Sequence, residues 1–417
     1  MNRPALATTS ATAEPATRAA AMPTTRRLLS PIRALLLQAS IVMVFLAASS
    51  APTPLYALYQ ARWGFSAITT TAIFGIYALA VLAALLTAGS LSDHVGRRPV
   101  LIGAVTVQAL TMLVFASANG VPMLVLARVI QGLSTGAAVG AVGAGMLDLD
   151  RQKGTLANSI GPMMGTATGG IVSGLMVQFL PAPTHLVYLV LFAVMLLQLG
   201  GLMRMPETVS PRPGALASLR PHFRLPAAVR PAVLIAAPAL VAAWALAGFY
   251  GSLGPALVRH LAGSSAVALG GLALFVLAAS GVVAVLLTRQ RAARSVLLLG
   301  TALLVVGVGI SLVAVAKGSL AGLFVGDAIA GMGFGSGFQG AIRTVVPLAQ
   351  PHERAGVLSV LYVISYLAMG LPAVIAGVLV VHGGGFAATT REFGLAVMGL
   401  AAVAFVSTLV TSRRVGS

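Results

Sequence analysis

Long apolar runs separated by short polar turns dominate this sequence. About twelve runs of roughly 20 residues are long enough to cross a hydrocarbon core as helices. The turns between them leave no room for a soluble domain. The pattern therefore predicts an all-α membrane protein with twelve transmembrane helices. The runs begin near Ala34, Ala67, Pro99, Val121, Gly154, His185, Pro231, Ala266, Ser295, Ser319, Ala355 and Phe393.

Two polar segments mark the ends of the apolar region, and a third divides it into two sets of six runs. Residues 1–33 are rich in Ala, Thr, Pro and Arg without periodicity, which predicts a disordered N-terminal tail. Residues 207–230 are rich in Pro and Arg and predict a linker between two halves. The expected units are therefore a six-helix bundle at 34–206, a second at 231–412, and a short tail at 413–417.

Composition strengthens this prediction and narrows the chemistry. The chain is 58% hydrophobic and 8% charged, with a mean hydropathy of +0.98, which is incompatible with a soluble globule. It contains no cysteine, so disulfides, thiolate metal sites and thiol nucleophiles are excluded. Its six histidines are too scattered to form a metal cluster. We expect no catalytic residue, no bound metal and no organic cofactor, and hence no enzyme.

The net charge of +18 indicates topology, because the basic residues lie in the gaps between apolar runs. With both termini on one face, that face collects 21 of the 26 basic residues, and Arg128 lies inside a run. The positive-inside rule then places both termini in the cytoplasm. We therefore expect no nucleic-acid partner. The four basic residues of the other face are Arg62, Arg259, Lys317 and Arg391.

The two halves show an internal repeat at an offset near 200 residues. The charged and glycine positions of the fourth run match those of the tenth at an offset of 199. This repeat predicts two six-helix bundles related by an axis along the membrane normal, with a site between them. The matched residues are Arg128, Gly132 and Gly136 with Asp327, Gly331 and Gly335.

Arg128 and Asp327 are the two charged residues that fall inside predicted spans. A charge at that depth costs at least about 2.5–3.5 kcal/mol, so each needs a partner or a hydrated cavity. They could form one buried ion pair, or backbone and hydroxyl groups could satisfy each separately. Alternatively, Asp327 takes up and releases a proton, while Arg128 tunes that carboxyl group or engages an anionic group. The sequence leaves these alternatives open.

Several motifs resemble the major facilitator superfamily of secondary transporters. The loop Gly-x-Leu-Ser-Asp-x-x-Gly-Arg-Arg, with Gly89, Asp93, Gly96, Arg97 and Arg98, resembles the loop between helices 2 and 3 of that family. The run Leu124-x3-Arg128-x2-Gln131-Gly132 is similar to its helix 4 motif. This resemblance implies that Arg128 takes part in proton transfer. It also implies the family's fold of two pseudo-symmetric bundles.

The fifth run resembles the helix 5 motif of the family's exporters. The matching residues are Gly161, Pro162 and Gly165, followed by Gly169 and Gly170. Two positions depart from the exporter pattern, because Ala157 and Thr166 stand where glycines are expected. The resemblance points to bacterial twelve-helix members similar to drug/proton antiporters, and hence to a bacterial-type inner membrane.

The loop motif predicts a gate on the cytoplasmic face. In the family, the aspartate of this loop approaches the start of helix 11, which here follows Glu353 and Arg354. Arg97 or Arg98 should pair with the acidic residues after helix 4, Asp148 or Asp150, beside Arg151. Such a network would hold this side closed in the outward-open state. The alternative is that Arg97 and Arg98 serve only to orient the chain.

Candidates for the substrate cavity are the polar and aromatic residues of the runs. Few are charged, so the cavity is expected to be mostly apolar and to suit a hydrophobic or weakly cationic solute. The candidates are Gln38, Tyr59, Tyr77, Asn158, Trp244, Tyr250, Gln339 and Tyr366, with Tyr56 and Tyr362 as further members.

The resulting hypothesis is a monomeric secondary active transporter with alternating access. We expect proton-coupled efflux of small amphiphilic compounds, with the proton gradient in place of a cofactor and with lipid, substrate and protons as partners. Within transport, the alternative is a proton symporter or uniporter that imports a small metabolite. From another class, a channel or receptor would not require matching halves.

Overall fold

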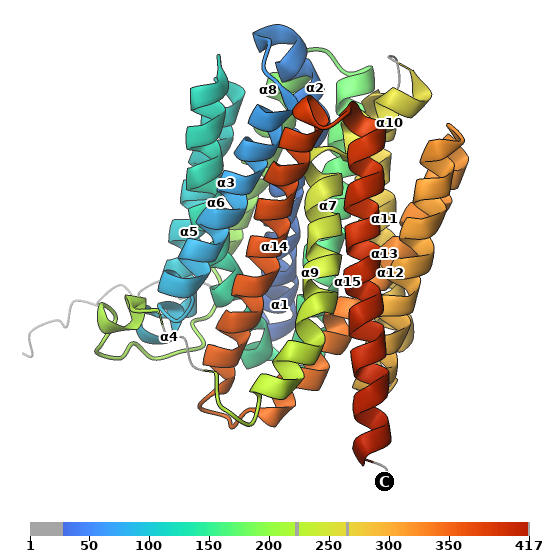
Figure 1. The fold of residues 1–417 in the computed structure, drawn as a ribbon. Helices are drawn as coiled ribbons and strands as arrows, with labels where there is room; N and C mark the ends of the chain where they lie inside the picture. The colour runs from blue at the N-terminus through green and yellow to red at the C-terminus, as the bar shows by residue number, and fades with distance from the viewer. Residues whose placement is uncertain (1–27, 222–224, 264–266, 416–417) are drawn as a thin grey trace, which may run out of the picture.

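The computed structural model describes residues 28–221, 225–263 and 267–415, and within these ranges the chain is helical without a β-strand (Figure 1). These ranges contain twelve helical segments that are long and apolar enough to cross a membrane. The predicted N-terminal tail lies mostly outside the described residues, and α1 begins at Pro31, inside its predicted limit of residue 33. The predicted C-terminal tail falls largely within the last helix, which extends to Val415.

The first half forms six spans, of which the first is built from two consecutive helices. Prolines at the start of α2 separate it from α1, since proline supplies no backbone N–H. The short α4 lies in the loop after the second span. The helices are α1 (Pro31–Ser50), α2 (Pro52–Trp63), α3 (Ala67–Ala88), α4 (Ser92–Val95), α5 (Arg97–Ala116), α6 (Val121–Leu149), α7 (Arg151–Phe179) and α8 (Pro183–Leu202).

The second half repeats this plan, with the short α10 extending α9 as α2 extends α1. Figure 1 shows α2 and α10 at one end of the molecule and α4 at the other, and we call these the α2 end and the α4 end. The helices are α9 (Arg230–Ser252), α10 (Gly254–Ala262), α11 (Val267–Thr288), α12 (Ala293–Ala316), α13 (Leu320–Val345), α14 (Arg354–His382) and α15 (Gly385–Val415).

Helix packing is the same in both halves, as the internal repeat predicts. In the first half α6 packs on α3 and α5, α5 packs on α8, and α1 packs on α7. In the second half α13 packs on α11 and α12, α12 packs on α15, and α9 packs on α14. The fold is therefore two pseudo-symmetric six-helix bundles.

Eleven of the predicted spans begin within three residues of the observed helices, but the twelfth begins at Gly385 rather than near Phe393. The intervening polar residues resemble a loop by hydropathy alone. In the structure, Thr389 is fully buried, and Thr390 donates its hydroxyl to the carbonyl of Phe386 one turn earlier. Tertiary burial and backbone hydrogen bonds thus extend the helix through a polar stretch.

The predicted linker at 207–230 is ordered over its described residues and lies against the loop that holds α4. Ser90 donates its hydroxyl to the carbonyl of Ser218, 3.0 Å away. The backbone N–H of Arg212 donates to the carbonyl of His94 at 2.8 Å. A 3₁₀ turn at Ala217–Leu219 also contacts α3. The linker is therefore packed onto the first bundle.

Glycines allow close helix contacts at equivalent places in the two bundles. A Cβ atom on Gly132 of α6 would lie 2.8 Å from the carbonyl oxygen of Tyr77 on α3. A Cβ on Gly331 of α13 would collide with the carbonyl of Leu277 on α11. These glycines are matched in the repeat, so each half uses the same small residue to bring the same pair of helices together.

The two bundles contact each other through α3 with α14 and through α7 with α11. Several of these contacts lie toward the α2 end. There, Thr53 donates its hydroxyl to the carbonyl of Gly251 across the boundary at 2.9 Å. Gly377 of α14 leaves room for the side chain of Thr71 of α3. The structure is therefore closed between the bundles at the α2 end.

Replacing Gly132 or Gly331 with leucine should lower the free energy of unfolding by about 1–3 kcal/mol each, because the added side chain meets backbone atoms that cannot move independently. Gly103→Leu is the matched control, since a Cβ on Gly103 of α5 would have no atom within 4 Å. Thermal unfolding in detergent measures the difference. Equal stability of Gly132→Leu and Gly103→Leu would contradict this account.

Candidate functional site

Arg97 is the centre of a network at the α4 end. Its side chain is 8% exposed, although it is charged and stands at the first position of α5. It forms an ion pair with Asp93 of α4, and its Nε lies 3.2 Å from Oδ2 of Asp148 at the end of α6. Its Nη1 donates to the hydroxyl of Ser92 at 2.7 Å. Two carboxylates and a hydroxyl thus offset the burial of one guanidinium.

Glu207, at the start of the linker, caps α5 from outside the helix. Its carboxylate accepts the backbone N–H groups of Arg97 at 2.9 Å and of Arg98 at 3.0 Å. These donors have no partner within the helix, and a carboxylate also suits the positive end of the helix dipole. Gly96 is required here, because its φ is +106° and a Cβ would lie 2.7 Å from Oε2 of Glu207.

The other glycine of the loop motif, Gly89, lies close to α6, where Gly140 permits the approach. A Cβ on Gly140 of α6 would lie 3.0 Å from the carbonyl oxygen of Gly89. This contact sets the end of α3 directly on α6. The positions Gly89 and Gly96 therefore shape the loop, while the charged positions hold it to α6 and to the linker.

The structure brings together some of the predicted gate partners and separates others. Arg97 pairs with Asp148, whereas Arg98 donates its Nη2 to the carbonyl of Met203 at 2.8 Å. Asp150 caps α7 by accepting the backbone N–H of Lys153, and this hydrogen bond lowers the pKa of the Asp150 carboxyl below its usual value. Arg151 is exposed at the start of α7.

No ion pair joins Asp93 to the start of α14 among the described residues, so this contact stays a prediction for the outward-open state. Asp93 pairs with Arg97 instead. Glu353 accepts the backbone N–H of Gln350, and Arg354 donates to the carbonyl of Ala349, so both act locally at the start of α14. The network thus belongs to the first bundle and the linker.

Arg128 lies fully buried inside the first bundle. Its guanidinium donates to the hydroxyl of Tyr56 at 2.7 Å, to the carbonyl of Ser49 at 2.8 Å and to Oε1 of Gln131 at 2.7 Å. The ring of Tyr77 lies 5.1 Å from the guanidinium carbon, which adds a cation–π contact. The positive charge is therefore held by neutral groups.

Asp327 lies fully buried at the equivalent place in the second bundle. Tyr250 of α9 donates its hydroxyl to Oδ1, and Ser311 of α12 donates to the same oxygen at 3.4 Å. Oδ2 has no hydrogen-bond partner. Tyr250 matches Ser49 in the repeat, so in both bundles the first spanning helix supplies oxygen to the buried charge.

The alternative of one buried ion pair between Arg128 and Asp327 is wrong, because each residue is enclosed by its own bundle. The alternative in which hydroxyl and backbone groups satisfy each charge separately agrees with most of their hydrogen bonds. The exceptions are the amide oxygen of Gln131, which also accepts from Arg128, and Oδ2 of Asp327, which has no partner. Sequence position could not decide this, since it gives the depth of a residue in the membrane but not the direction of its side chain.

The glycines of α7 separate into two faces. A Cβ on Gly165 or Gly169 would collide with α1 at Met43 or Ala47, and one on Gly161 would also meet α1. Gly170 faces α11 of the second bundle. Pro162 lies within the helix, where it removes one backbone hydrogen bond. This motif therefore joins α7 both to its own bundle and to the other.

Six of the eight principal cavity candidates make a contact within their own bundle, and their place in a substrate cavity stays a prediction. A polar side chain inside an apolar run signals a partner, and here the partner is another helix of the same bundle. The contacts are Gln38 to Met205, Tyr59 to Tyr188, Tyr77 to Arg128, Asn158 to the carbonyl of Gly143, Tyr250 to Asp327, and Gln339 to Thr288.

Trp244 and Tyr366 do meet at the boundary between the bundles. The Trp244 ring centroid lies 5.3 Å from that of Tyr366 and 5.4 Å from that of Phe338, and its Nε1 has no hydrogen-bond partner. Trp244 and Tyr366 also pack with Phe74 of the first bundle. We call Phe74, Trp244, Phe334, Phe338 and Tyr366 the boundary aromatic cluster. The sequence did not indicate that its phenylalanines belong to this cluster, because phenylalanine is common throughout apolar helices.

Metal binding finds no support in the described part of the chain, where no group of three or more His, Cys, Asp or Glu side chains is suitably placed. The boundary aromatic cluster likewise offers one N–H donor, from Trp244, and one tyrosine hydroxyl, from Tyr366, rather than a set of charged ligands. The arrangement is suited to holding an apolar or cationic solute between aromatic faces.

Comparisons with known proteins agree with this geometry. The family model described as Major Facilitator Superfamily matches residues 39–292. The fold resembles a mutant of the nucleoside transporter NupG, at 13% identity, 91% coverage of this chain, 98% of that chain and a TM-score of 0.66. It also resembles a bacterial homologue of the human lysosomal transporter Spinster in an inward-facing, occupied conformation. The identity is 14%, the match covers 92% of this chain and 98% of that chain, and the TM-score is 0.70. A comparison with curated protein sequences gave no match.

Glu207→Ala should destabilise the α4 end by about 0.5–2 kcal/mol, because the first amides of α5 lose their capping carboxylate. Hydrogen exchange at the amides of Arg97 and Arg98 should accelerate, and Glu207→Gln, which keeps an acceptor oxygen, should show a smaller change. Glu392→Ala is the control, since Glu392 is exposed on α15. Unchanged protection in Glu207→Ala would show that the cap does not hold α5.

Proposed function

Because the chain belongs to the Major Facilitator Superfamily and is a multi-pass membrane transporter, we propose that it couples proton movement to the efflux of small amphiphilic compounds by alternating access. The observation that carries the proposal is Asp327, a fully buried carboxyl group with no cationic partner among the described residues and one unpartnered oxygen. Contacts of Arg128, of the boundary aromatic cluster and of Asp93 support the proposed proton path, substrate class and gate, respectively.

The proposed orientation places the α4 end in the cytoplasm. Under this orientation 21 of the 26 basic residues belong to cytoplasmic segments, as the positive-inside rule requires. Contacts at the α2 end, such as that of Thr53 with Gly251, then close the outer side. The conformation is therefore closed on its outer side under this proposal.

Asp327 is the proposed proton carrier. Its side chain is held by two neutral hydroxyl groups, so binding a proton removes a buried charge and releasing it restores that charge. Tyr250 and Ser311 come from α9 and α12, which means that movement between these helices changes the environment of the carboxyl group. A proton-dependent carboxyl group between moving helices is a physical basis for coupling.

Arg128 is proposed to act on the outer side of the proton path. Its partner Tyr56 also lines a small cavity between α2 and α10 at the α2 end, of about 20 Å³. A space of that size holds about one water molecule. Polar residues of both bundles, including Gln60 and Ser252, line the same cavity. A water there would connect the hydroxyl beside Arg128 to the boundary between the bundles.

The boundary aromatic cluster is the proposed contact surface for substrate. Trp244, Phe334 and Phe338 offer aromatic faces from one bundle, with Phe74 packed nearby from the other. Aromatic faces bind apolar groups and attract cations, whereas they offer no recognition to phosphates or carboxylates. This composition favours small amphiphilic or weakly cationic compounds.

Import of a small metabolite by proton symport or uniport is the second candidate. It is favoured by the two departures from the exporter pattern in α7, where Ala157 and Thr166 replace expected glycines. NupG, which shares the fold, is described as a nucleoside transporter. The direction of proton-driven accumulation in oriented vesicles separates the two candidates.

The gate is proposed to close in the outward-open state, when Asp93 leaves its local partner and caps the start of α14. The side chain of Asp93 is 52% exposed, so it is free to exchange partners, while that of Arg97 is 8% exposed and retains Asp148. Gly96 and Glu207 would keep α5 fixed during this exchange. The bundles would then close at the α4 end.

Asp327→Asn should abolish acceleration of flux by a pH gradient, because an amide cannot take up and release the proton. The measurement is uptake into proteoliposomes of a panel of amphiphilic cations and of nucleosides, with and without a gradient. Glu392→Gln, which neutralises an exposed acid of α15, should retain full acceleration. Counterflow without a gradient reports whether the variant is folded. Gradient-driven flux that survives in Asp327→Asn would remove this residue from coupling.

Asp93→Asn should slow transport severalfold without lowering the melting temperature, because it weakens the proposed cap on α14 while Arg97 keeps Asp148. Spin labels on α4 and on the start of α14 should show a smaller population with the α4 end closed. His94→Gln serves as control, since the hydrogen bond of that neighbouring side chain is a local one, to the carbonyl of Ser90. Normal transport together with an unchanged distance distribution would refute the gate.

A further inference from the structure

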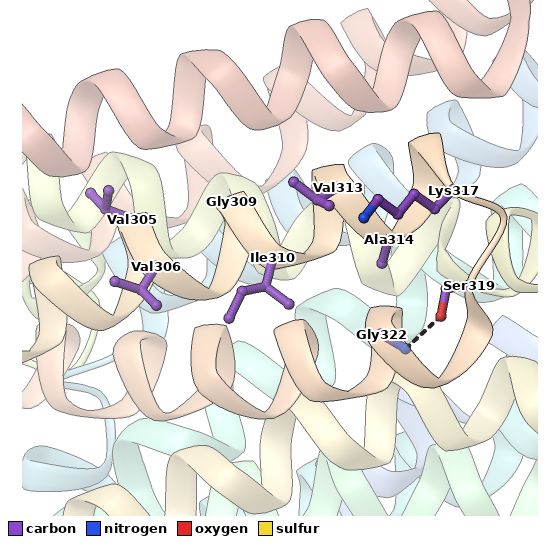
Figure 2. Close-up of a pocket in the computed structure, with 9 residues that line it drawn as sticks. All are labelled: Val305, Val306, Gly309, Ile310, Val313, Ala314, Lys317, Ser319 and Gly322. Atoms are coloured by element: carbon purple, nitrogen blue, oxygen red, sulfur yellow. Dashed lines mark hydrogen bonds between the residues drawn. The ribbon is translucent and has the colours of Figure 1, made fainter.

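An apolar groove lies on the outer face of the second bundle, away from the boundary between the bundles. Its volume is about 550 Å³, within the range of about 300–1,000 Å³ typical of ligand sites. Figure 2 shows it running along one face of α12 beside the start of α13. The lining residues are Val305, Val306, Gly309, Ile310, Val313, Ala314, Lys317, Ser319 and Gly322.

The length of the groove matches one leaflet of a bilayer. Residues 305–317 span twelve helical steps, or about 18 Å at 1.5 Å per residue. One leaflet contributes about 15 Å to a hydrocarbon core of about 30 Å. Val306 is 52% exposed and Val313 is 55% exposed, so the groove faces the surrounding lipid rather than the protein core. Its inner part thus reaches the middle of the membrane.

The groove has aliphatic walls and a single charge at its end. Lys317 follows the last residue of α12 at the α2 end and is exposed. Figure 2 shows its side chain turning back along α12 toward Val313, so the ammonium group lies over the groove. No carboxylate pairs with it in the described part of the chain. Lys317 is one of two lysines in the sequence, and the other, Lys153, lies at the α4 end.

A glycine forms the floor of the groove. A Cβ on Gly309 would lie 3.6 Å from the terminal methyl of Met398 on α15, which is an ordinary contact. Helix packing therefore does not require glycine here, in contrast to Gly132 and Gly331. The missing side chain instead leaves space that is open to lipid.

We propose that this groove binds one anionic phospholipid of the leaflet at the α2 end, with an acyl chain along α12 and the headgroup phosphate on Lys317. The positive charge at the membrane edge complements an anionic headgroup. The aliphatic walls complement the chain over the depth of one leaflet. The site is independent of the proposed substrate path, because it lies on the outer face of α12 and α13.

The experiment uses the full chain in mixed micelles with two photoactivatable lipids, phosphatidylglycerol and phosphatidylcholine, which carry the same diazirine-labelled acyl chain. Mass spectrometry of the digested protein then measures labelling of residues 305–317. We expect phosphatidylglycerol to label this segment about fivefold more than phosphatidylcholine, the ratio expected for one lysine beside an anionic headgroup.

Four variants test the two parts of the site separately. Lys317→Gln should equalise labelling by the two lipids, whereas Lys317→Arg should keep the preference. Gly309→Leu should fill the floor and reduce labelling by both lipids, and Val306→Trp tests the same space should Gly309→Leu fail to fold. Lys153→Gln, the matched control at the α4 end, should leave labelling of residues 305–317 unchanged.

Two results would overturn the proposal. One is equal labelling by the two lipids in the unmodified chain, or a preference that survives in Lys317→Gln, since either would show ordinary lipid contact without recognition of the headgroup. The other is cross-linking of α12 to α12 of a second copy without lipid labelling, which would make the groove a contact between protein chains.

Discussion

The structure depends on one constraint: the hydrocarbon core supplies no water, so backbone polar groups and buried charges rely on partners within the protein. Arg128 shows how this is done, because a hydroxyl, a carbonyl and an amide oxygen receive its donors, and all come from helices of one bundle. Those hydrogen bonds draw α1, α2 and α6 together around the charge. Asp327 does the same for α9 and α12 in the second bundle, but one of its oxygens remains unpartnered. Asp327 has fewer hydrogen-bond partners than Arg128, so it is the better candidate for a residue that changes its protonation state.

Close packing is the second requirement, and glycine meets it at matched positions of the repeat. Gly132 and Gly331 bring α6 onto α3 and α13 onto α11 through the same small residue. This close packing makes each bundle a stable unit. Fewer polar contacts join the two bundles to each other than join the helices within each bundle. Motion is therefore expected at the boundary, where the aromatic cluster offers apolar surface without directional bonds. Rigid halves with an apolar boundary suit alternating access.

The loop at the α4 end combines permanent and exchangeable contacts. Glu207 fixes the start of α5, and Arg97 is held by Asp148, so these groups form a base that belongs to one bundle. Asp93 is the exposed member of the network and has a partner within its own segment. A gate built in this way needs to move a single side chain between two partners. The sequence motif contains the movable acid but not the capping glutamate, which lies 110 positions after Arg97.

The sequence by itself determined the number and limits of most spans, the two halves and the depth of the charges, because hydropathy, charge and repeat spacing are properties of the chain. For the loop it predicted only that Arg97 or Arg98 pairs with Asp148 or Asp150, and the structure selected Arg97 with Asp148. Only the tertiary structure decided where side chains point. It separated Arg128 from Asp327, gave Tyr59, Asn158 and Gln339 hydrogen-bond partners within their own bundles, and showed Glu207 as the cap of α5. The reason is geometric: position in an apolar run gives depth within the membrane, whereas rotation about the helix axis is set by packing against other helices.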